Sequence, residues 1–445
     1  MKFVTRSIIS FNSPKVTTMP LLSLSPLTPL SPLTPLIKKP MKLSVKSIFL
    51  TLLVATLCLP AMAQRLEHKL YVSKPGEKIY RIPAIACTVD GTLIAVSDDR
   101  YNHGSDVGYA KPIDIMCRLS EDNGLTWKPE QKLADCHEEI YKGRVYGFGD
   151  AAIAADRDSD RQIALCVGDS TGRTVFQQGF QQVYRFYGTN NGKTWSKGEN
   201  ITHKIYSLVP QLECLFIGSG KIHQSRYVKK GKYYRLYCSL LSLKYGNAVI
   251  YSDDFGENWS LLGTTESCCP EGDEPKTEEL PDGSVILSSR TGGRWFNIFR
   301  FDDKTYTTGH WEKPVKARDI ICQKNECNGE IMGIKAYDKQ AKKKVWLYLQ
   351  SVPYGPNRSH VSIFYKALPY KVDCKTITPQ NFGEGWERFE ITPDDSGYST
   401  FCLTADKQIA FLYERAPVAD QWLYDIWFEK LSIEKITNGR YTIKK

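Results

Sequence analysis

Acidic residues are absent from the first 63 positions of the chain, although the whole sequence contains 49 Asp and Glu. The same 63 residues hold seven Lys and Arg, so the formal net charge of +10 comes mainly from this end. The remaining residues carry 52 Lys and Arg against 49 Asp and Glu, a net charge of only +3. This balance removes the electrostatic argument for a nucleic-acid or membrane-surface partner.

Three further features are missing after residue 63. No helical hydrophobic period lasts for three turns, and no apolar run is long enough to cross a membrane. Twelve of the 13 cysteines lie in this part, but none forms a C-x-x-C metal pattern. A core of this size does not need disulfides, so their pairing stays open. We expect no metal and no cofactor.

The acid-free end contains the pattern of an export signal. Two lysines after Met41 precede the apolar run Ser47–Leu59, and Ala61-Met62-Ala63 supplies small residues at the spacing of a cleavage site. This pattern predicts a secretory signal peptide over residues 41–63, with cleavage before Gln64. A signal-anchor helix is the alternative, but the apolar core is short for a bilayer. We expect export to the periplasm, the cell surface or the medium.

Residues 1–40 differ from a structured domain because they include a low-complexity run of Leu, Pro, Ser and Thr. We interpret them as an upstream extension translated in error, with Met41 as the true start. A start at Met1 stays open.

Three similar stretches of eight residues predict the fold. They are Ser-Glu-Asp-Asn-Gly-Leu-Thr-Trp at Ser120–Trp127, Gly-Thr-Asn-Asn-Gly-Lys-Thr-Trp at Gly188–Trp195 and Ser-Asp-Asp-Phe-Gly-Glu-Asn-Trp at Ser252–Trp259. The second has Asn190 where the others have Asp. An Asp or Asn side chain can bond the backbone two residues on, and Gly accepts positive φ, so each stretch predicts a tight hairpin turn.

The spacing of these turns predicts how many units the chain contains. Their tryptophans lie 68 and 64 residues apart, and the 382 residues from Gln64 onward make nearly six such units. Short β-like runs and further turns such as Asp90-Gly91 and Asp282-Gly283 fill the sequence between them. We therefore predict one all-β domain, residues 64–445, folded as a six-bladed β-propeller.

Three arginines lie where a β-protein gains little stability from them. Arg81 lies within Tyr80-Arg81-Ile82-Pro83, Arg290 ends Ser288-Ser289-Arg290, and Arg358 follows a loop that contains Gly355-Pro356. Together with the repeated turn, they resemble the bacterial exo-sialidase (neuraminidase) family. The resemblance covers the whole of residues 64–445 and implies a six-bladed propeller with Asp-box turns.

The resemblance also implies a role for each of nine residues. They are Tyr398 as nucleophile, Glu274 as its base, Asp106 as acid/base, Arg81, Arg290 and Arg358 as carboxylate ligands, Arg100 and more weakly Asp150 as contacts to the sugar, and Glu414 as the support of Arg81.

The chemistry of sialic acid explains why these residue types belong together. This sugar carries a carboxylate on its anomeric carbon, and guanidinium groups bind carboxylates as planar forks. The same carboxylate repels a carboxylate nucleophile, whereas a neutral phenol avoids the repulsion. A phenol has a pKa near 10, so Glu274 would have to take its proton as Tyr398 attacks. Double displacement through a tyrosyl intermediate, the exception that this family makes among glycosidases, would retain the anomeric configuration.

Other residues compete for several of these roles. Asp98 and Asp99 lie close to Asp106 in the sequence, and any of the three could cap a turn. Glu271, Glu278 and Glu279 compete with Glu274 in the same way, and Tyr398 is one of 25 tyrosines. A fourth copy of the turn is weak, at Phe301 to Trp311.

The sequence as a whole predicts an exo-α-sialidase that removes terminal sialic acid from sialylated glycoproteins, glycolipids or oligosaccharides. One alternative is a trans-sialidase or intramolecular trans-sialidase that uses the same intermediate. Another is a non-catalytic propeller that binds glycans. We expect a monomer with no nucleic-acid partner and no membrane-spanning segment in the mature chain.

Overall fold

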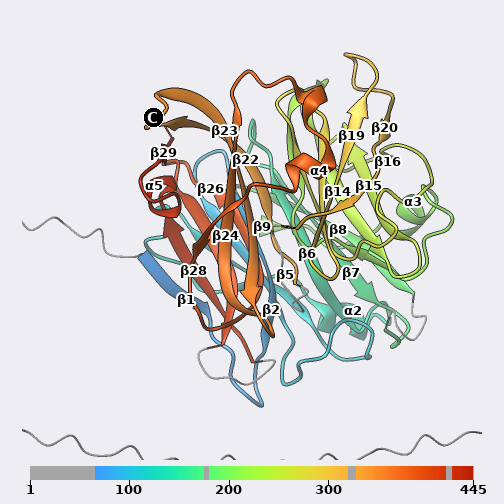
Figure 1. The fold of residues 1–445 in the computed structure, drawn as a ribbon. Coiled ribbons are helices and arrows are strands. Elements are labelled where there is room, and N and C mark those ends of the chain that lie inside the picture. The colour runs from blue at the N-terminus through green and yellow to red at the C-terminus, as the bar shows by residue number, and fades with distance from the viewer. Residues whose placement is uncertain (1–65, 175–179, 319–326, 417–422, 444–445) are drawn as a thin grey trace, which may run out of the picture. The chain divides into compact units, whose positions relative to one another are not determined.

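A computed structural model describes residues 66–174, 180–318, 327–416 and 423–443 (Figure 1). These residues belong to one compact unit that spans Gln64–Lys445. The upstream extension (1–40) and the signal peptide (41–63) predicted from the sequence lie outside the described residues.

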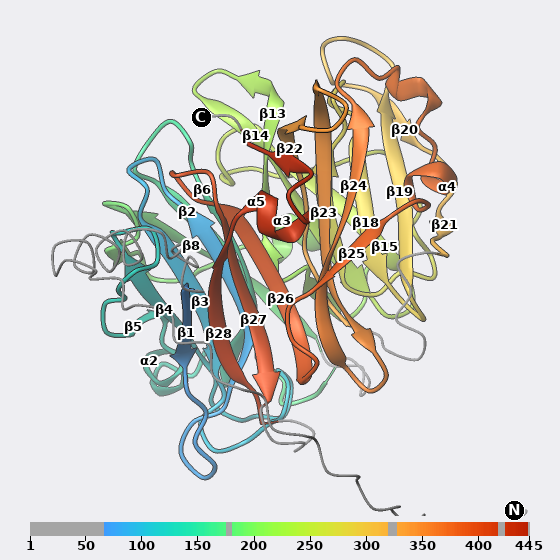
Figure 2. The ribbon, with the colours of Figure 1, turned by 60° about the vertical axis from the view of Figure 1, so that its left-hand side comes forward.

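The described part of the chain is nearly all β and contains five hydrogen-bonded sheets (Figures 1 and 2). The first sheet consists of β2 (Tyr80–Cys87), β3 (Leu93–Asp99), β4 (Asp114–Ser120) and β5 (Gln131–Ala134). The second consists of β6 (Gly147–Ala155), β7 (Gln162–Asp169), β8 (Gln181–Thr189), β9 (Thr194–Trp195), β10 (Glu199–Asn200) and β12 (Gly220–Lys221). The third consists of β11 (Leu215–Ile217), β13 (His223–Lys230), β14 (Tyr233–Ser242), β15 (Gly246–Ser252) and β16 (Ser260–Leu261).

The fourth sheet consists of β17 (Pro275–Glu279), β18 (Val285–Arg290), β19 (Arg294–Phe301), β20 (Gly309–Trp311) and β21 (Val315–Lys316). The fifth has nine strands, β22 (Ile331–Asp338), β23 (Lys343–Gly355), β24 (Ser359–Pro369), β25 (Glu387–Glu390), β26 (Asp395–Leu403), β27 (Ile409–Ala416), β28 (Asp425–Leu431), β29 (Tyr441–Thr442) and β1 (Leu66–Tyr71). Its strand order has two groups of strands, which meet where Ser359 of β24 pairs with Asp395 of β26.

Short helices connect some of the strands in the described ranges. They are α2 (Cys136–Tyr141), α3 (Thr202–Tyr206), the 3₁₀ helix η2 (Cys374–Thr376), α4 (Pro379–Phe382) and α5 (Ile433–Ile436). None of these described helices has the length and apolarity needed to cross a membrane.

Contacts between the sheets close a ring. β2 contacts both β6 and β26, β11 contacts β6, and β17 contacts both β14 and β22. β23 contacts β26, and β1 pairs antiparallel with β28, so the first strand of the described chain completes the last sheet. With the largest sheet counted as its two groups, the arrangement is consistent with the six blades that the repeat predicts.

The three repeated turns share positive φ at their two central residues, and the second turn adds a positive φ of 53° at Asn190. Their central pairs have φ of 55° and 87° at Asn123 and Gly124, 55° and 82° at Asn191 and Gly192, and 59° and 86° at Phe255 and Gly256. A Cβ on these glycines would lie only 2.2 to 2.5 Å from a side chain of another strand, namely Phe428, Ile94 or Ile163. Glycine is therefore required at these positions for two reasons, the positive φ of the turn and the close approach of a neighbouring blade.

The side-chain bonds of these turns differ from the prediction in one respect. In the first turn Asp122 Oδ1 accepts the N–H of Thr126, four residues on rather than two, at 2.9 Å. In the third turn Asp254 Oδ1 accepts the N–H of Asn258 in the same way, at 2.9 Å. The longer span follows from the turn conformation, in which the chain after the glycine folds back over the carboxylate. The weak fourth copy connects β19 and β20, which pair antiparallel.

The structure also answers the open question of the cysteines within the described ranges. All eleven cysteines there are free, including the neighbours Cys268 and Cys269. The core of the described unit is therefore held by packing and hydrogen bonds without disulfides.

Candidate active site

Three strands at the centre of the ring, β2, β6 and β26, have irregular pairing with their neighbours. The pairing register shifts between Arg81 and Ala84 in β2, and between Ser396 and Ser399 in β26. The same happens in β6 around Asp150, which has a φ of 58°. Such interruptions bend a strand and redirect its side chains. Here they place Arg81 beside Tyr398 and direct Asp150 and Tyr398 into one pocket.

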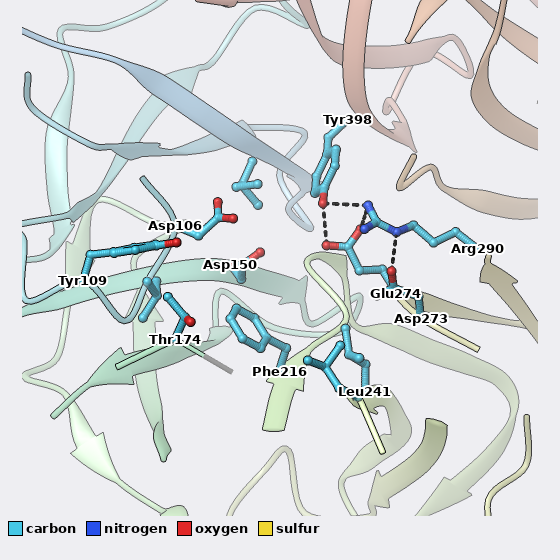
Figure 3. A pocket seen from close by; sticks show the side chains of 13 residues that line it. Asp106, Tyr109, Asp150, Thr174, Phe216, Leu241, Asp273, Glu274, Arg290 and Tyr398 are labelled. Carbon is cyan, nitrogen blue, oxygen red and sulfur yellow. Dashed lines mark hydrogen bonds and ion pairs between the residues drawn. The ribbon is translucent and has the colours of Figure 1, made fainter. Parts of the chain in front are cut away.

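Tyr398 lines this pocket on the same side as Glu274 and Arg290 (Figure 3). Its hydroxyl donates a hydrogen bond to Glu274 Oε1 at 2.6 Å and accepts one from Arg290 Nη1 at 2.9 Å. Arg290 Nη1 also donates to Glu274 Oε2 at 2.9 Å, and Arg290 Nε donates to Asp273 Oδ2 at 2.9 Å. The phenol oxygen is thus held between a carboxylate that can take its proton and a guanidinium that can stabilise a phenolate.

Three arginines surround the ring of Tyr398. The Cζ atoms of Arg81, Arg290 and Arg358 lie 5.7, 5.7 and 5.6 Å from the centre of the ring. They come from β2, from the end of β18 and from the loop before β24, where Arg358 has a φ of 59°. Three guanidinium groups around one residue favour an anionic ligand with a planar carboxylate.

Glu414 of β27 connects Arg81 to the backbone of Tyr398. Its Oε1 accepts hydrogen bonds from Arg81 Nε and from the N–H of Ile82, both at 2.8 Å. Its Oε2 accepts the N–H of Tyr398 at 2.8 Å. A Cβ added at Gly397 would lie 2.0 Å from that oxygen, so the glycine allows the approach. This fully buried carboxylate therefore offsets the charge of Arg81 and fixes the backbone of β26.

Asp106 lies across the pocket from Glu274 and Arg290, in the loop between β3 and β4 (Figure 3). Arg100 Nη1 donates to Asp106 Oδ1 at 2.5 Å, and Arg100 Nη2 lies 3.3 Å from Asp98 Oδ2. The Arg100 side chain is fully buried, whereas that of Asp106 is 65% exposed. Asp106 is thus anchored at one oxygen and accessible to a ligand in the pocket.

The structure separates the competing aspartates by their contacts. Asp99 Oδ1 accepts the N–H of Tyr101 at 3.0 Å and so caps a turn. Asp98 is buried and paired with Arg100. Of the three aspartates, Asp106 alone is among the described residues that line the pocket.

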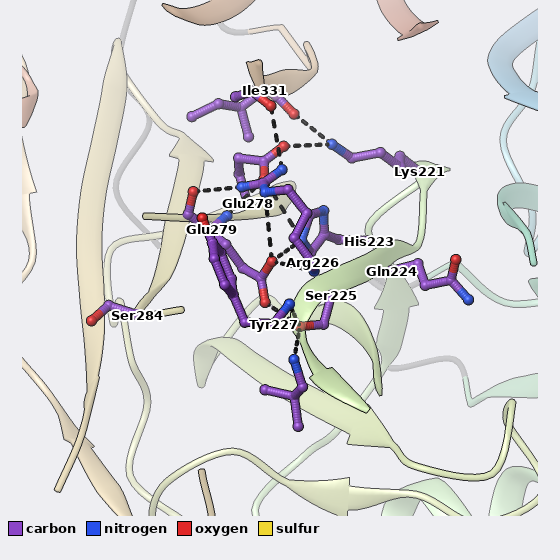
Figure 4. Close-up of polar contacts among 12 residues, drawn as sticks. Lys221, His223, Gln224, Ser225, Arg226, Tyr227, Glu278, Glu279, Ser284 and Ile331 are labelled. Atoms are coloured by element: carbon purple, nitrogen blue, oxygen red, sulfur yellow. Dashed lines mark hydrogen bonds and ion pairs between the residues drawn. The ribbon is translucent and has the colours of Figure 1, made fainter. Parts of the chain in front are cut away.

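The competing glutamates are separated in the same way. Glu278 and Glu279 are buried in a different cluster (Figure 4), where Arg226 Nη2 lies 2.7 Å from Glu278 Oε1 and His223 Nε2 lies 3.2 Å from Glu279 Oε2. Glu271 is exposed and is not among the lining residues. Glu274, immediately before β17, is the glutamate that reaches the phenol.

The local environment adjusts the acidity of the two residues that form the central hydrogen bond. Burial raises the pKa of Glu274, and Arg290 opposes this only in part. Burial also raises the pKa of Tyr398 well above 10 despite Arg290, so the phenol is protonated at neutral pH. A carboxylate whose pKa is raised toward neutrality is a better proton acceptor for that phenol.

The carboxylates on the other side of the pocket behave differently. Partial desolvation by the pocket raises the pKa of Asp106, but Arg100 and Arg81 lower it further, and the net result lies below the ordinary value. Burial raises the pKa of Asp98 to about 7, and burial together with Asp98 raises the pKa of Asp150 well above its ordinary value. Asp106 is therefore ionised in the free site.

All nine residues predicted from the sequence thus lie in or directly around one pocket. Sequence reasoning missed Asp273, which neighbours Glu274 and binds Arg290. It also missed the remaining lining residues, Ile82, Val107, Tyr109, Thr174, Phe216, Leu241 and Leu243. Residue types like these occur throughout a β-protein, so nothing in the sequence marks them. The carboxylates near the pocket pair largely with arginines, an arrangement better suited to an anion than to a metal cation.

The whole chain matches no protein-family model. It is 28% identical to a sialidase of Micromonospora viridifaciens over 355 residues, which is 77% of this chain and 50% of that protein. It is 27% identical to a sialidase of Paraclostridium sordellii over 272 residues, which is 58% of this chain and 64% of that protein. In sequence the chain is similar to these bacterial sialidases.

Solved sialidase structures have a fold similar to that of this chain. A Hadza microbial sialidase superposes with a TM-score of 0.60 at 21% identity, and the match covers 80% of this chain and 66% of that protein's chain. The intramolecular trans-sialidase of Ruminococcus gnavus superposes with a TM-score of 0.63 at 15% identity, and the match covers 85% of this chain and 99% of that protein's chain. At these identities the matches show a shared fold. The chain spans one half to two thirds of the length of the two sialidases that it matches in sequence.

Proposed function

We propose that this chain is an exo-α-sialidase that hydrolyses terminal sialic acid from glycoproteins, glycolipids or oligosaccharides with retention of configuration. The observation that carries the proposal is the Tyr398 hydroxyl, held at 2.6 Å from Glu274 and 2.9 Å from Arg290. A buried tyrosine with a general base and a cation on its oxygen has the arrangement of an activated nucleophile.

Substrate binding begins with the carboxylate on the anomeric carbon. Arg81, Arg290 and Arg358 would bind it, and their positions around the Tyr398 ring would bring the anomeric carbon close to the phenol oxygen. Arg100 and Asp150 would contact the polar edge of the sugar. Holding the reacting atoms in this geometry removes much of the entropic cost of the reaction.

The first chemical step forms a bond between Tyr398 Oη and the anomeric carbon. Glu274 accepts the phenol proton as this bond forms, and Asp106 donates a proton to the departing glycosidic oxygen as that bond breaks. Asp106 must be protonated for this step. The substrate carboxylate would partly neutralise Arg81, one of the cations that lower the pKa of Asp106, so binding itself favours the protonated form.

The second step releases the sugar. Asp106, now ionised, accepts a proton from a water molecule whose oxygen attacks the anomeric carbon. The bond to Tyr398 breaks, and Glu274 returns its proton to the phenol. Two inversions at the same carbon retain the configuration.

Substrates with different leaving groups test the role of Asp106. Because an activated aryl alcohol departs without much protonation, Asp106→Ala should lose less than about tenfold in release of the fluorophore from an aryl sialoside. On sialyllactose, whose leaving group is an alkyl alcohol, the loss should be about a hundredfold or more. The matched control is Asp303→Asn, a change on an exposed turn outside the pocket. Equal losses on both substrates would exclude the acid role.

The same assay separates the alternative functions through its product. Free sialic acid is the expected product of the wild type. An anhydro sugar would identify an intramolecular trans-sialidase, and a sialylated acceptor would identify a transferase. No turnover, together with retained glycan binding, would identify a non-catalytic binding propeller.

The raised pKa of Glu274 predicts a specific pH dependence. Glu274 acts in its ionised form, so on the activated aryl sialoside, which needs little protonation by Asp106, kcat/KM should rise with pH through the Glu274 pKa, which lies above the ordinary 4.5. Asp273 is a negative neighbour that raises this pKa. Asp273→Asn should therefore move the acidic limb of the profile to lower pH. The measurement is kcat/KM from pH 4 to 8, with Asp303→Asn again as control, and an unchanged or upward-shifted limb would contradict the assignment.

We further propose that the mature protein is exported by the signal peptide and works as a monomer on glycoconjugates outside the cytoplasm. The acid-free N-terminal segment with its apolar run supports this proposal. N-terminal sequencing of the protein recovered from the periplasm or medium would test the predicted start at Gln64.

A further inference from the structure

We propose that Asp114, Cys136 and His137 form a zinc-binding site beside the loop that carries Asp106. Asp114 begins β4, directly after this loop, and Cys136 and His137 begin α2. The proposed sialidase mechanism uses none of the three. Their ligand atoms all lie within 4.8 Å of one another, although 22 residues separate Asp114 from Cys136 in the sequence.

The distances between the ligand atoms approach those of a tetrahedral site. Cys136 Sγ lies 3.6 Å from His137 Nδ1, and His137 Nδ1 lies 3.8 Å from Asp114 Oδ1. Zinc bonds of roughly 2.0 to 2.3 Å with tetrahedral angles place the ligand atoms about 3.3 to 3.7 Å apart. The Cys136 sulfur and the Asp114 carboxylate lie within 4.8 Å of each other, so side-chain movements of roughly 1 Å or less would bring all three atoms to zinc.

The donor set is also one that zinc prefers. A thiolate, an imidazole and a carboxylate are the three side-chain types that bind this ion, and calcium or magnesium would reject the sulfur. Asp114 is fully buried and Cys136 is buried, whereas the side chain of His137 is 50% exposed. The site is therefore open on one side, which gives zinc an entry path and leaves a fourth position for water.

Neighbouring groups already orient Asp114. Its Oδ1 accepts the N–H of Cys136 at 2.8 Å, and its Oδ2 accepts the hydroxyl of Tyr101 at 2.5 Å. Hydrogen bonds of this kind fix ligating carboxylates in metal sites. Zinc would replace the contact of 3.1 Å between the Tyr101 hydroxyl and His137 Nδ1.

The site has a direct connection to the catalytic loop. Tyr101 follows Arg100, which binds Asp106 at 2.5 Å, and Tyr101 packs edge-on against the ring of His137. Zinc would thus tie both ends of the segment that carries Asp106 to α2. Because zinc would bind the folded protein, it should raise the melting temperature.

Lys132 opposes the binding of a cation. Its Nζ lies 2.8 Å from Asp114 Oδ2 and 2.9 Å from Asp135 Oδ1. The lysine side chain is 39% exposed, so it can turn into solvent when zinc binds. Removal of this positive charge should strengthen zinc binding, because it leaves two carboxylates beside the ion. Binding would release the proton of the Cys136 thiol to the buffer as the zinc–sulfur bond forms.

Cobalt(II) provides the test, because it enters zinc sites and a cobalt–thiolate bond absorbs in the near ultraviolet. We expect the purified protein to bind one equivalent of cobalt with this absorption, to lose it when zinc is added, and to melt at a higher temperature with zinc. Cys136→Ser and His137→Ala should weaken binding about a hundredfold, and Cys136→Ser should abolish the thiolate band. Lys132→Met should bind cobalt about tenfold more tightly than the wild type.

Two matched controls show whether the binding is specific. Cys117→Ser changes a buried thiol of β4, the strand that Asp114 begins, and His310→Ala removes a histidine that lies 3.1 Å from Asp302 and belongs to no three-ligand cluster among the described residues. Both controls should keep the band and the affinity. A band that persists in Cys136→Ser, or its absence from both the wild type and Lys132→Met, would overturn the proposal. If Cys136→Ser fails to fold, the tighter binding expected of Lys132→Met decides the question by itself.

Discussion

Replacement of Tyr398 by Phe should lower kcat for release of sialic acid about ten-thousandfold, because the substitution removes the oxygen that forms the covalent intermediate. The three arginines that would bind the substrate carboxylate keep their places in this variant. Binding of a sialic acid analogue should therefore change less than about tenfold, so that the loss falls on kcat. The measurement is the rate of fluorophore release together with the dissociation constant of the analogue by calorimetry.

Tyr348→Phe is the matched control for this prediction. Tyr348 is also fully buried, and its hydroxyl donates one hydrogen bond, to the carbonyl of Glu279 at 3.0 Å, outside the pocket. Its loss should leave kcat within about twofold, because a single neutral hydrogen bond contributes mainly to stability. Activity in Tyr398→Phe comparable to that of the control would rule out the tyrosyl intermediate.

Replacement of Glu414 by Gln should lower the free energy of unfolding by about 3 to 5 kcal/mol. Both oxygens of Glu414 accept hydrogen bonds, from Arg81 and Ile82 on one side and from Tyr398 on the other. A glutamine has one acceptor oxygen, so its NH2 group would face an N–H or a guanidinium. The substitution also leaves the buried charge of Arg81 without its carboxylate. Denaturant unfolding measures the effect.

Glu390→Gln gives the corresponding control for stability. Glu390 also pairs with a cation, since its Oε2 lies 3.2 Å from Arg388 Nη1, but its side chain is 37% exposed. The change should cost about 1 kcal/mol or less, because solvent screens an exposed pair. A Glu414→Gln variant as stable as Glu390→Gln would show that Arg81 does not depend on this carboxylate.

The fold could be predicted largely from local patterns. The turn repeat contains glycines that need positive φ, and such a requirement acts within a few residues of the chain. For this reason the degraded copy keeps the positive φ at Asn191 and Gly192, although Asn190 also has a positive φ that Asp122 and Asp254 lack. What the repeat did not reveal is why the glycines are also needed for packing. Gly256, for example, lies against Ile163, a residue almost one hundred positions away.

The candidate site was predicted through its unusual arginines and the resemblance that they support. The residues themselves left alternatives open, such as Glu278 and Glu279 for the base. The structure distinguishes them because β17 runs along the centre of the ring, so that Glu274 reaches the pocket while Glu278 reaches a separate cluster with Arg226. The residue types alone do not show which end of β17 lies at the pocket, so they could not distinguish Glu274 from Glu278.

The sequence by itself determined the all-β class and the repeated turns, because these depend on residue type and short spacing, and the set of residues suited to an anionic sugar followed from its resemblance to sialidases. The tertiary structure decided which of those residues meet. Tyr398 and Glu274 are 124 positions apart, and Arg81 and Glu414 are 333 apart. They come together only because the sheets close a ring that β1 completes by pairing with β28. The pKa values of Glu274 and Asp106, and the meeting of Asp114 with Cys136 and His137, arise from the same closure, since burial and neighbouring charges are properties of the assembled fold.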